Sequence, residues 1–200
     1  AERYTFAGGE GHILLNLGEG LTNESGAMVR RVSATEIEGT KLLGTFCYNP
    51  QAVFPVYFVL RVSKTPTASG YWKKQPPKHG VEAEWDKDNG KYKLYTSYGR
   101  ELAGDDVGYW FTFDGLAEDE QVEVRMGVSF VSAENARKNL DAEQPADTTF
   151  DALREQARKA WNEALGRIRV EGGTEAQQTV FYTALYHTLI HPNLVSDVNG

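Results

Sequence analysis

The chain has 200 residues, of which 40% are hydrophobic and 12% aromatic, enough for the core of one domain or of one domain and part of another. Its formal charge is −7, which argues against a nucleic-acid surface, because such a surface needs a basic patch. The apolar runs are far too short for a membrane span, and a single cysteine, Cys47, excludes a disulfide framework.

Residues 1–131 show the period-two alternation of half-buried strands, separated by turn residues such as Gly8-Gly9 and Asp88-Asn89-Gly90. The segment Phe54–Ser63 is apolar on both faces, which predicts a central strand. The predicted strands are Tyr4–Phe6, His12–Leu17, Met28–Ser33, Thr35–Glu38, Leu42–Tyr48, Phe54–Ser63, Val81–Trp85, Lys91–Thr96, Val107–Asp114 and Gln121–Val131. Many short strands with regular turns predict a mainly β fold, an antiparallel β-sandwich over residues 1–131.

The hydrophobic period changes to that of helices at Ser132. Ser132 and Glu134 are typical of a helix N-terminus and predict a short helix to about Glu143. A longer helix is predicted from Phe150 to Ile168, with an apolar stripe about 140° wide that we expect to be buried. We therefore interpret residues 132–173 as a helical linker.

The last predicted helix runs from Thr174 to Ile190 or His191. Thr174-Glu175-Ala176-Gln177 matches the capping box at its start. Apolar side chains surround this helix almost completely, which is typical of a helix buried on several sides. Nothing later in the sequence can cover it, so we expect a piece of a larger protein in which residues 174–200 begin a second, helical domain.

Several segments, in this order, resemble one enzyme family. They are residues 126–140 (MGVSFVSAENARKNL), 150–161 and 181–200 (FYTALYHTLIHPNLVSDVNG), together with Glu36-Ile-Glu-Gly39 and the strand Val56–Ser63. This order is similar to the junction of the glycoside hydrolase family 92 α-mannosidases. The resemblance implies an N-terminal β-sandwich that leads through linker helices into an (α/α)6 barrel, whose first helix lies in residues 174–200.

The resemblance also implies a function, which is calcium-dependent exo-hydrolysis of α-mannosides with inversion, on mannose-containing glycans. Inverting hydrolysis needs two carboxyl groups about 6.5–9.5 Å apart, and calcium takes about six to eight oxygen ligands. By the same resemblance, the acid, the base and most calcium ligands lie in the remainder of the barrel, beyond Gly200. We therefore assign no catalytic or metal residue here, and we expect the 200 residues alone to be inactive. Bacterial members of the family are commonly exported, which predicts a periplasmic or extracellular location.

Asn193, Ser196 and Asp197 follow the last predicted helix, where loops of the family turn toward the barrel mouth. Two interpretations stay open. In one, the loop faces the sugar or calcium, and Asn193 and Asp197 bind substrate. In the other, the segment is a polar turn whose side chains cap backbone groups, since turns favour these residue types.

For several histidine and aromatic side chains, both a binding role and a packing role stay open. His187 and His191 have a spacing that occurs in zinc sites, but no third ligand is evident, which favours packed or capping histidines. Tyr71, Trp72 and Trp85 are candidates for stacking on sugar rings, although large aromatics more often fill a core.

The thiol and the clustered carboxylates favour structural roles. Cys47 lies in a predicted strand without an activating base beside it, so we expect a small buried apolar residue. Asp105-Asp106 and Glu118-Asp119-Glu120 lack the alternating spacing of a calcium loop and are expected on the surface.

Two alternatives to an enzyme fragment stay open. One is a non-catalytic carbohydrate-binding sandwich with a helical tail, and the other is a structural domain that offers its last helix to a partner. The codons after Gly200 separate them, because a helical continuation with acidic motifs favours the enzyme and a stop codon favours the alternatives.

Overall fold

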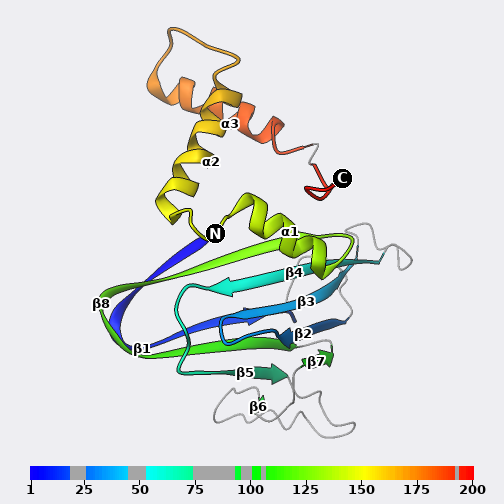
Figure 1. Cartoon of the computed structure of the whole chain (residues 1–200). Helices are drawn as coiled ribbons and strands as arrows, with labels where there is room; N and C mark the ends of the chain where they lie inside the picture. Colours follow the sequence, from blue (N-terminus) through cyan, green and yellow to red (C-terminus); the bar gives the residue numbers. More distant parts are fainter. Residues whose placement is uncertain (19–25, 45–52, 74–92, 96–100, 105–106, 192–193) are drawn as a thin grey trace, which may run out of the picture.

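The computed structural model describes residues 1–18, 26–44, 53–73, 93–95, 101–104, 107–191 and 194–200. In this part of the chain, eight strands form one antiparallel sheet that three helices follow (Figure 1). The strands are β1 (Glu2–Asn16), β2 (Ala27–Arg31), β3 (Glu36–Leu43), β4 (Phe54–Val62), β5 (Ala68–Lys73), β6 (Lys93–Tyr95), β7 (Glu101–Gly104) and β8 (Val107–Ser129). The helices are α1 (Ala133–Glu143), α2 (Phe150–Leu165) and α3 (Glu175–Thr188).

The strand order confirms the predicted antiparallel architecture. Along the sheet the order is β6-β5-β8-β4-β3-β2-β7, and β1 pairs with β8 outside this path. The predicted central strand, β4, lies between β3 and β8. Two strands that the sequence did not predict, β5 and β7, complete the described sheet, whereas the predicted strand Val81–Trp85 lies outside the described residues.

Two long strands, β1 and β8, belong to both layers of the sandwich. The first part of β8 pairs with β5, and its last part pairs with β4. Both strands bend where residues adopt positive φ, at Gly8 and Gly9 (90° and 83°) and at Gly115 and Asp119 (65° and 61°). Register shifts accompany the bend, and Figure 1 shows the two strands curving together, so that the sheet folds over on itself.

This bend explains why the sequence predicted shorter strands than the structure has. Gly8-Gly9 is a bend inside β1 rather than a turn between Tyr4–Phe6 and His12–Leu17. Glycine tolerates positive φ without steric cost, so the backbone changes direction there while pairing to β8 continues on both sides.

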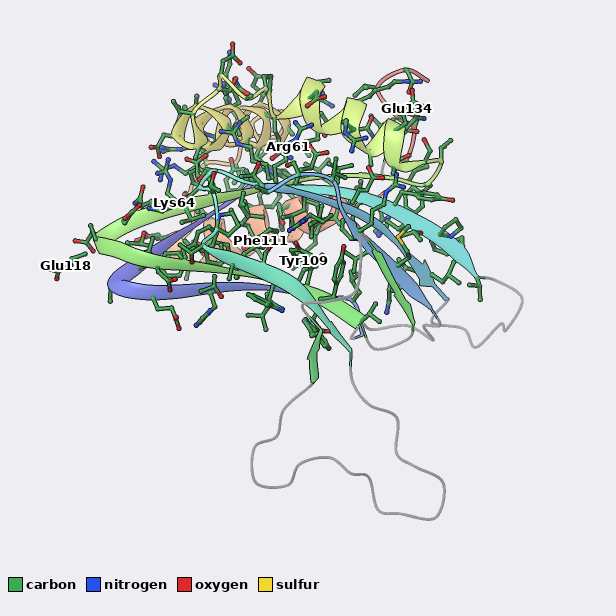
Figure 2. The ribbon with its side chains drawn as sticks, turned by 60° about the horizontal axis from the view of Figure 1, so that its bottom comes forward. Arg61, Lys64, Tyr109, Phe111, Glu118 and Glu134 are labelled. Carbon is green, nitrogen blue, oxygen red and sulfur yellow. The ribbon has the colours of Figure 1, made fainter. Side chains whose placement is uncertain are left out.

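The core fills the space between the layers. Figure 2 shows Tyr109 and Phe111 between the layers, and both side chains are 1% exposed. The ring of Tyr109 contacts those of Tyr71 and Phe111, with centroids 5.0 and 4.9 Å apart. Gly39 permits close packing here, because a Cβ at this position would lie 2.1 Å from the carbonyl oxygen of Met28.

The helix α1 covers the outer face of the sheet over β4 and β8, as Figure 1 shows. Its N-terminus confirms the prediction, since the Ser132 hydroxyl accepts a hydrogen bond from the Asn135 amide at 3.1 Å. Val59, Ala136 and Leu140 form a small buried cluster between helix and sheet. The helix approaches so closely that a Cβ at Gly127 would lie 2.3 Å from the carbonyl oxygen of Ala136.

The helices α2 and α3 confirm two predicted segments but differ from α1 in burial. The predicted capping box is present, with both Thr174 and Gln177 side chains bonded to the other's backbone amide. No side chain of α3 is buried, and Val180 is 69% exposed, as expected for a helix that this chain does not cover. The predicted buried face of α2 is wrong for this chain, because α2 has no buried side chain.

The side chains of α2 stay unburied because few other elements lie beside this helix. Its apolar stripe contacts α3 through the ring of Trp161, whose centroid lies 4.7 Å from that of Tyr186, and Trp161 remains 38% exposed. Figure 1 shows α2 and α3 projecting away from the sheet. In the described part of the chain, we find no helix with the length and apolar character that a membrane crossing requires.

Candidate functional site

The segment 194–200, which we call the loop after α3, contacts α1 through Asp197. Figure 1 shows the C-terminus near α1. Asp197 is 9% exposed, and its carboxylate accepts three hydrogen bonds from side chains. Asn139 Nδ2 donates to Oδ1 at 2.7 Å, while Asn135 Nδ2 and Ser129 Oγ donate to Oδ2 at 2.6 and 3.0 Å. We call this group of four residues the Asp197 cluster.

Two members of the Asp197 cluster bind the surrounding backbone as well. Asn139 donates to the carbonyl oxygen of Val128 at 2.8 Å and accepts from the amide of Val198 at 2.9 Å. Ser129 accepts from the amide of Val131 at 2.9 Å, where β8 ends. The cluster therefore joins the last strand, the first helix and the loop after α3.

The electrostatics of the cluster favour a charged Asp197. Hydrogen bonds from Asn139, and then from Asn135 and Ser129, lower the pKa of the Asp197 carboxyl against the opposing effect of desolvation. The carboxylate also lies near the first turn of α1, where Asn135 is the third helical residue and the helix dipole favours a negative charge. Three neutral donors, with a smaller contribution from the positive charge of Lys138, thus hold the acid as a carboxylate.

The structure therefore places one of the two predicted substrate ligands. Asp197 is nearly buried and its oxygens bind protein donors, whereas Asn193 lies outside the described residues. The partners of Asp197 were missed from the sequence. One signal for two of these partners was available in the segment 126–140. Asn135 and Asn139 are four residues apart, which places both side chains on one face of a helix.

A network of carboxylates and guanidinium groups fixes α1 on the sheet. Arg137 binds Glu36 at 2.8 Å and Glu38 at 2.6 Å, and Arg61 binds Glu36 and Asp141, both at 2.5 Å. Figure 2 shows Arg61 on the face of the sheet that carries the helices.

Glu38 is the most buried member of this network, with a side chain 6% exposed. Burial raises the pKa of its carboxyl, but hydrogen bonds from Arg137 and Arg30 outweigh burial and leave this pKa lowered. The phrase Glu36-Ile-Glu-Gly39 thus has a structural role, because its two carboxylates hold α1 while Ile37 is fully buried in the core.

Two arginines of the sheet hold the connection between α1 and α2. Arg125 donates to the carbonyl oxygens of Pro145 at 2.7 Å and Thr148 at 2.6 Å. Arg3 binds Asp151 at 3.1 Å, and its guanidinium carbon lies 4.4 Å from the centre of the Phe150 ring. These contacts fix the direction in which α2 leaves the sheet.

The other candidate side chains lie apart from the Asp197 cluster. Tyr71 and Trp72 are each 4% exposed, which fits core packing rather than stacking on sugars, and Trp85 lies outside the described residues. Figure 2 shows Glu118 at the tip of the folded sheet, and Glu120 pairs there with Lys64. Cys47 and Asp105-Asp106 also lie outside the described residues.

Within the residues that the structure describes, no three His, Cys, Asp or Glu side chains are close enough together to hold a metal ion. His187 lies on the exposed surface of α3, its ring 5.7 Å from that of Tyr186. We therefore assign no calcium or zinc ligands within the described residues.

Comparisons with known sequences agree across both halves of the chain. The sequence model described as the glycosyl hydrolase family 92 N-terminal domain matches residues 1–129, and the model of the family's catalytic domain matches residues 135–200. An uncharacterized secreted glycosidase from Arthroderma benhamiae is 35% identical over 75 residues. That match spans 36% of this chain and 10% of the fungal protein.

Solved structures share the fold over nearly the whole chain. The family GH92 α-mannosidase BT3965 from Bacteroides thetaiotaomicron is 24% identical, with a TM-score of 0.77, over 99% of this chain. The GH92 glycosyl hydrolase ccman5 is 25% identical, with a TM-score of 0.78, over the same share. In both, the chain spans 24% of the relative's length. The sequence model of the family's N-terminal domain matches well over half of the residues of this chain. This chain therefore belongs to glycoside hydrolase family 92.

Proposed function

We propose that this chain supplies the N-terminal sandwich and first helices of an α-mannosidase that acts on mannose-containing glycans. One observation carries the proposal: 99% of this chain superimposes on a GH92 α-mannosidase with a TM-score of 0.77. The matches to both the N-terminal and the catalytic domain of the family support the same assignment.

The role of the chain in that enzyme is to position the helical domain. The carboxylate and guanidinium network fixes α1, and Arg125 and Arg3 fix the start of α2. The exposed apolar side chains of α3 are then available to pack against the remainder of the (α/α)6 barrel. In this proposal the 200 residues support and wall the site but do not hydrolyse glycans alone.

The proposed reaction is hydrolysis with inversion. A relative of known structure, BT2199 from Bacteroides thetaiotaomicron, is described as an inverting mannosidase. Inversion requires one carboxylic acid that protonates the leaving oxygen and one carboxylate that activates water on the opposite face of the sugar. We propose that both belong to the part of the catalytic domain outside the matched residues 135–200.

Mannose as the substrate sugar is supported by a second structure of BT3965, which contains mannoimidazole. The contacts predicted for Asn193 and Asp197 with substrate stay predictions.

Calcium dependence is proposed from the family resemblance alone. Because no group of three His, Cys, Asp or Glu side chains that could hold a metal ion is found among the described residues, we assign no step to the ion. Removing calcium with EDTA and restoring it would test the dependence.

Activity of the full-length protein on α-linked mannobiose tests the proposal. We expect release of mannose, with the β-anomer formed first in the proton NMR spectrum, and no release of glucose from α-linked glucobiose. The 200-residue chain is expected to hydrolyse neither disaccharide. Absence of mannose release by the full-length protein, with calcium present, would contradict the proposed function.

An extracellular or periplasmic location is also proposed. The fungal relative is described as secreted, and this supports export. Fractionation of the native host, with activity assayed in the medium, the periplasm where one exists, and the cytoplasm, would test it. Activity confined to the cytoplasm would contradict export.

A further inference from the structure

The loop after α3 is held to β8 and α1 at two adjacent residues, Asp197 and Val198. Three side-chain donors bind the two oxygens of this carboxylate at 2.6–3.0 Å. A carboxylate has about four lone-pair sites for hydrogen bonds, so the protein itself fills most of them. A residue whose acceptors are filled in this way has little capacity left for sugar hydroxyls.

The bonds of Asn139 extend this attachment to the backbone. Its amide group binds Asp197, the carbonyl oxygen of Val128 and the amide of Val198. Asn139 is 7% exposed, so removal of its side chain would leave buried polar groups without partners. The attachment therefore depends on two residues that lie 58 positions apart in the sequence.

We propose that Asp197 is a positioning residue, which with Asn139 fixes the loop after α3 against the end of β8 and the start of α1. Asp197 then acts on catalysis through the placement of this loop and not by binding the sugar. The hydrogen bonds define the attachment, and the catalytic consequence rests on the function proposed above.

A double-mutant cycle in the full-length protein tests this inference. The variants are Asp197→Ala, Asn139→Ala and the double variant, and the readouts are kcat/KM on α-linked mannobiose and hydrogen–deuterium exchange of the peptide spanning 194–200. We expect each single variant to raise exchange of this peptide about tenfold and to lower kcat/KM about tenfold. The double variant should lose no more than the larger single loss, because both changes break one attachment.

Asp147→Ala is the matched control, since it removes an exposed carboxylate between α1 and α2 and should change neither readout. If Asn139→Ala does not fold, Asn135→Ala replaces it in the same cycle, because it removes one donor to Asp197.

Two results separate the inference from the proposed function. In the first, Asp197→Ala lowers kcat/KM without changing hydrogen–deuterium exchange, and the kcat/KM losses of Asp197→Ala and Asn139→Ala add in the double variant. This result would show that Asp197 acts directly on the substrate and would overturn the inference. A wild-type protein without mannosidase activity would overturn the proposed function, while the exchange readout would still support or overturn the attachment of the loop.

Discussion

The sheet with α1 and the pair α2–α3 differ in how their apolar side chains are covered. In the first region, Tyr109, Phe111 and Leu140 are each 1% exposed, and glycines at close approaches let strands and helix pack tightly. In the second region no side chain is buried, although both helices are well capped. Caps and periodicity therefore define a helix, whereas its stability within a fold depends on a partner that covers its apolar face.

The largest difference between the regions should come from removing core volume. We expect Phe111→Ala to lower the free energy of unfolding of the chain by about 3–5 kcal/mol, because it leaves a cavity between the layers. The counterpart on α3, Val180→Ala, should change it by less than about 0.5 kcal/mol, since Val180 is 69% exposed. Urea denaturation measures both, and equal losses would contradict the distinction.

The network beneath α1 should give the next largest effect. Arg137→Met removes this guanidinium from Glu36 and Glu38, which keep Arg61 and Arg30 as partners. It should cost about 1.5–3 kcal/mol, the range for hydrogen bonds to charged groups. The neighbouring variant Lys138→Met breaks an exposed pair with Glu134 and should change the free energy of unfolding far less. A similar cost for the two variants in urea denaturation would show that the network contributes little.

The same network predicts a pH dependence. The pKa of Glu38 is lowered by folding, so its stabilisation is present above the unfolded pKa and is lost as the pH falls through the folded pKa. The stability gap between wild type and Arg137→Met should therefore be full at pH 7 and narrow as the pH falls below about 4.5. Denaturation curves between pH 3 and 7 measure it, and a constant gap would contradict this origin.

The smallest expected effects come from the caps. Ser132→Ala removes the cap of α1 and should lower the free energy of unfolding by about 1 kcal/mol, because α1 is packed on the sheet through Ala136 and Leu140. Thr174→Ala removes the capping box of α3 and should reduce helical circular dichroism while changing the main transition by less than about 0.5 kcal/mol. A matching shift of the main transition would show that α3 unfolds together with the sheet.

Much of the fold could be predicted because its signals are local. Alternation predicted the antiparallel sandwich, and Ser132 and Thr174 predicted helix starts at the observed residues. Strand β5 was missed because Ser69 and Gly70 are poor strand formers, and Gly70 is required by the cross-strand Trp110, whose ring a Cβ would approach to 2.9 Å. Such a requirement is visible only once the strands are paired.

The candidate site was less predictable, because its contacts join distant positions. Asp197 was selected as a polar residue in a loop, but its partners Ser129 and Asn139 lie 68 and 58 positions away. The ion pairs between Arg137 and the two glutamates of β3 span about 100 positions. Single-sequence patterns carry no information on such pairings, whereas the family resemblance identified the segments that contain most of them.

The apolar surface of α3 is exposed in these 200 residues, and we propose that the rest of the catalytic domain covers it. Hydroxyl-radical footprinting of Val180, Tyr186 and Leu189, compared between the 200-residue chain and the full-length protein, measures this coverage. We expect strong labelling of all three in the chain and protection in the full-length protein, with Leu14 labelled and Phe111 protected in both. Equal labelling of the three side chains in the two proteins would contradict it.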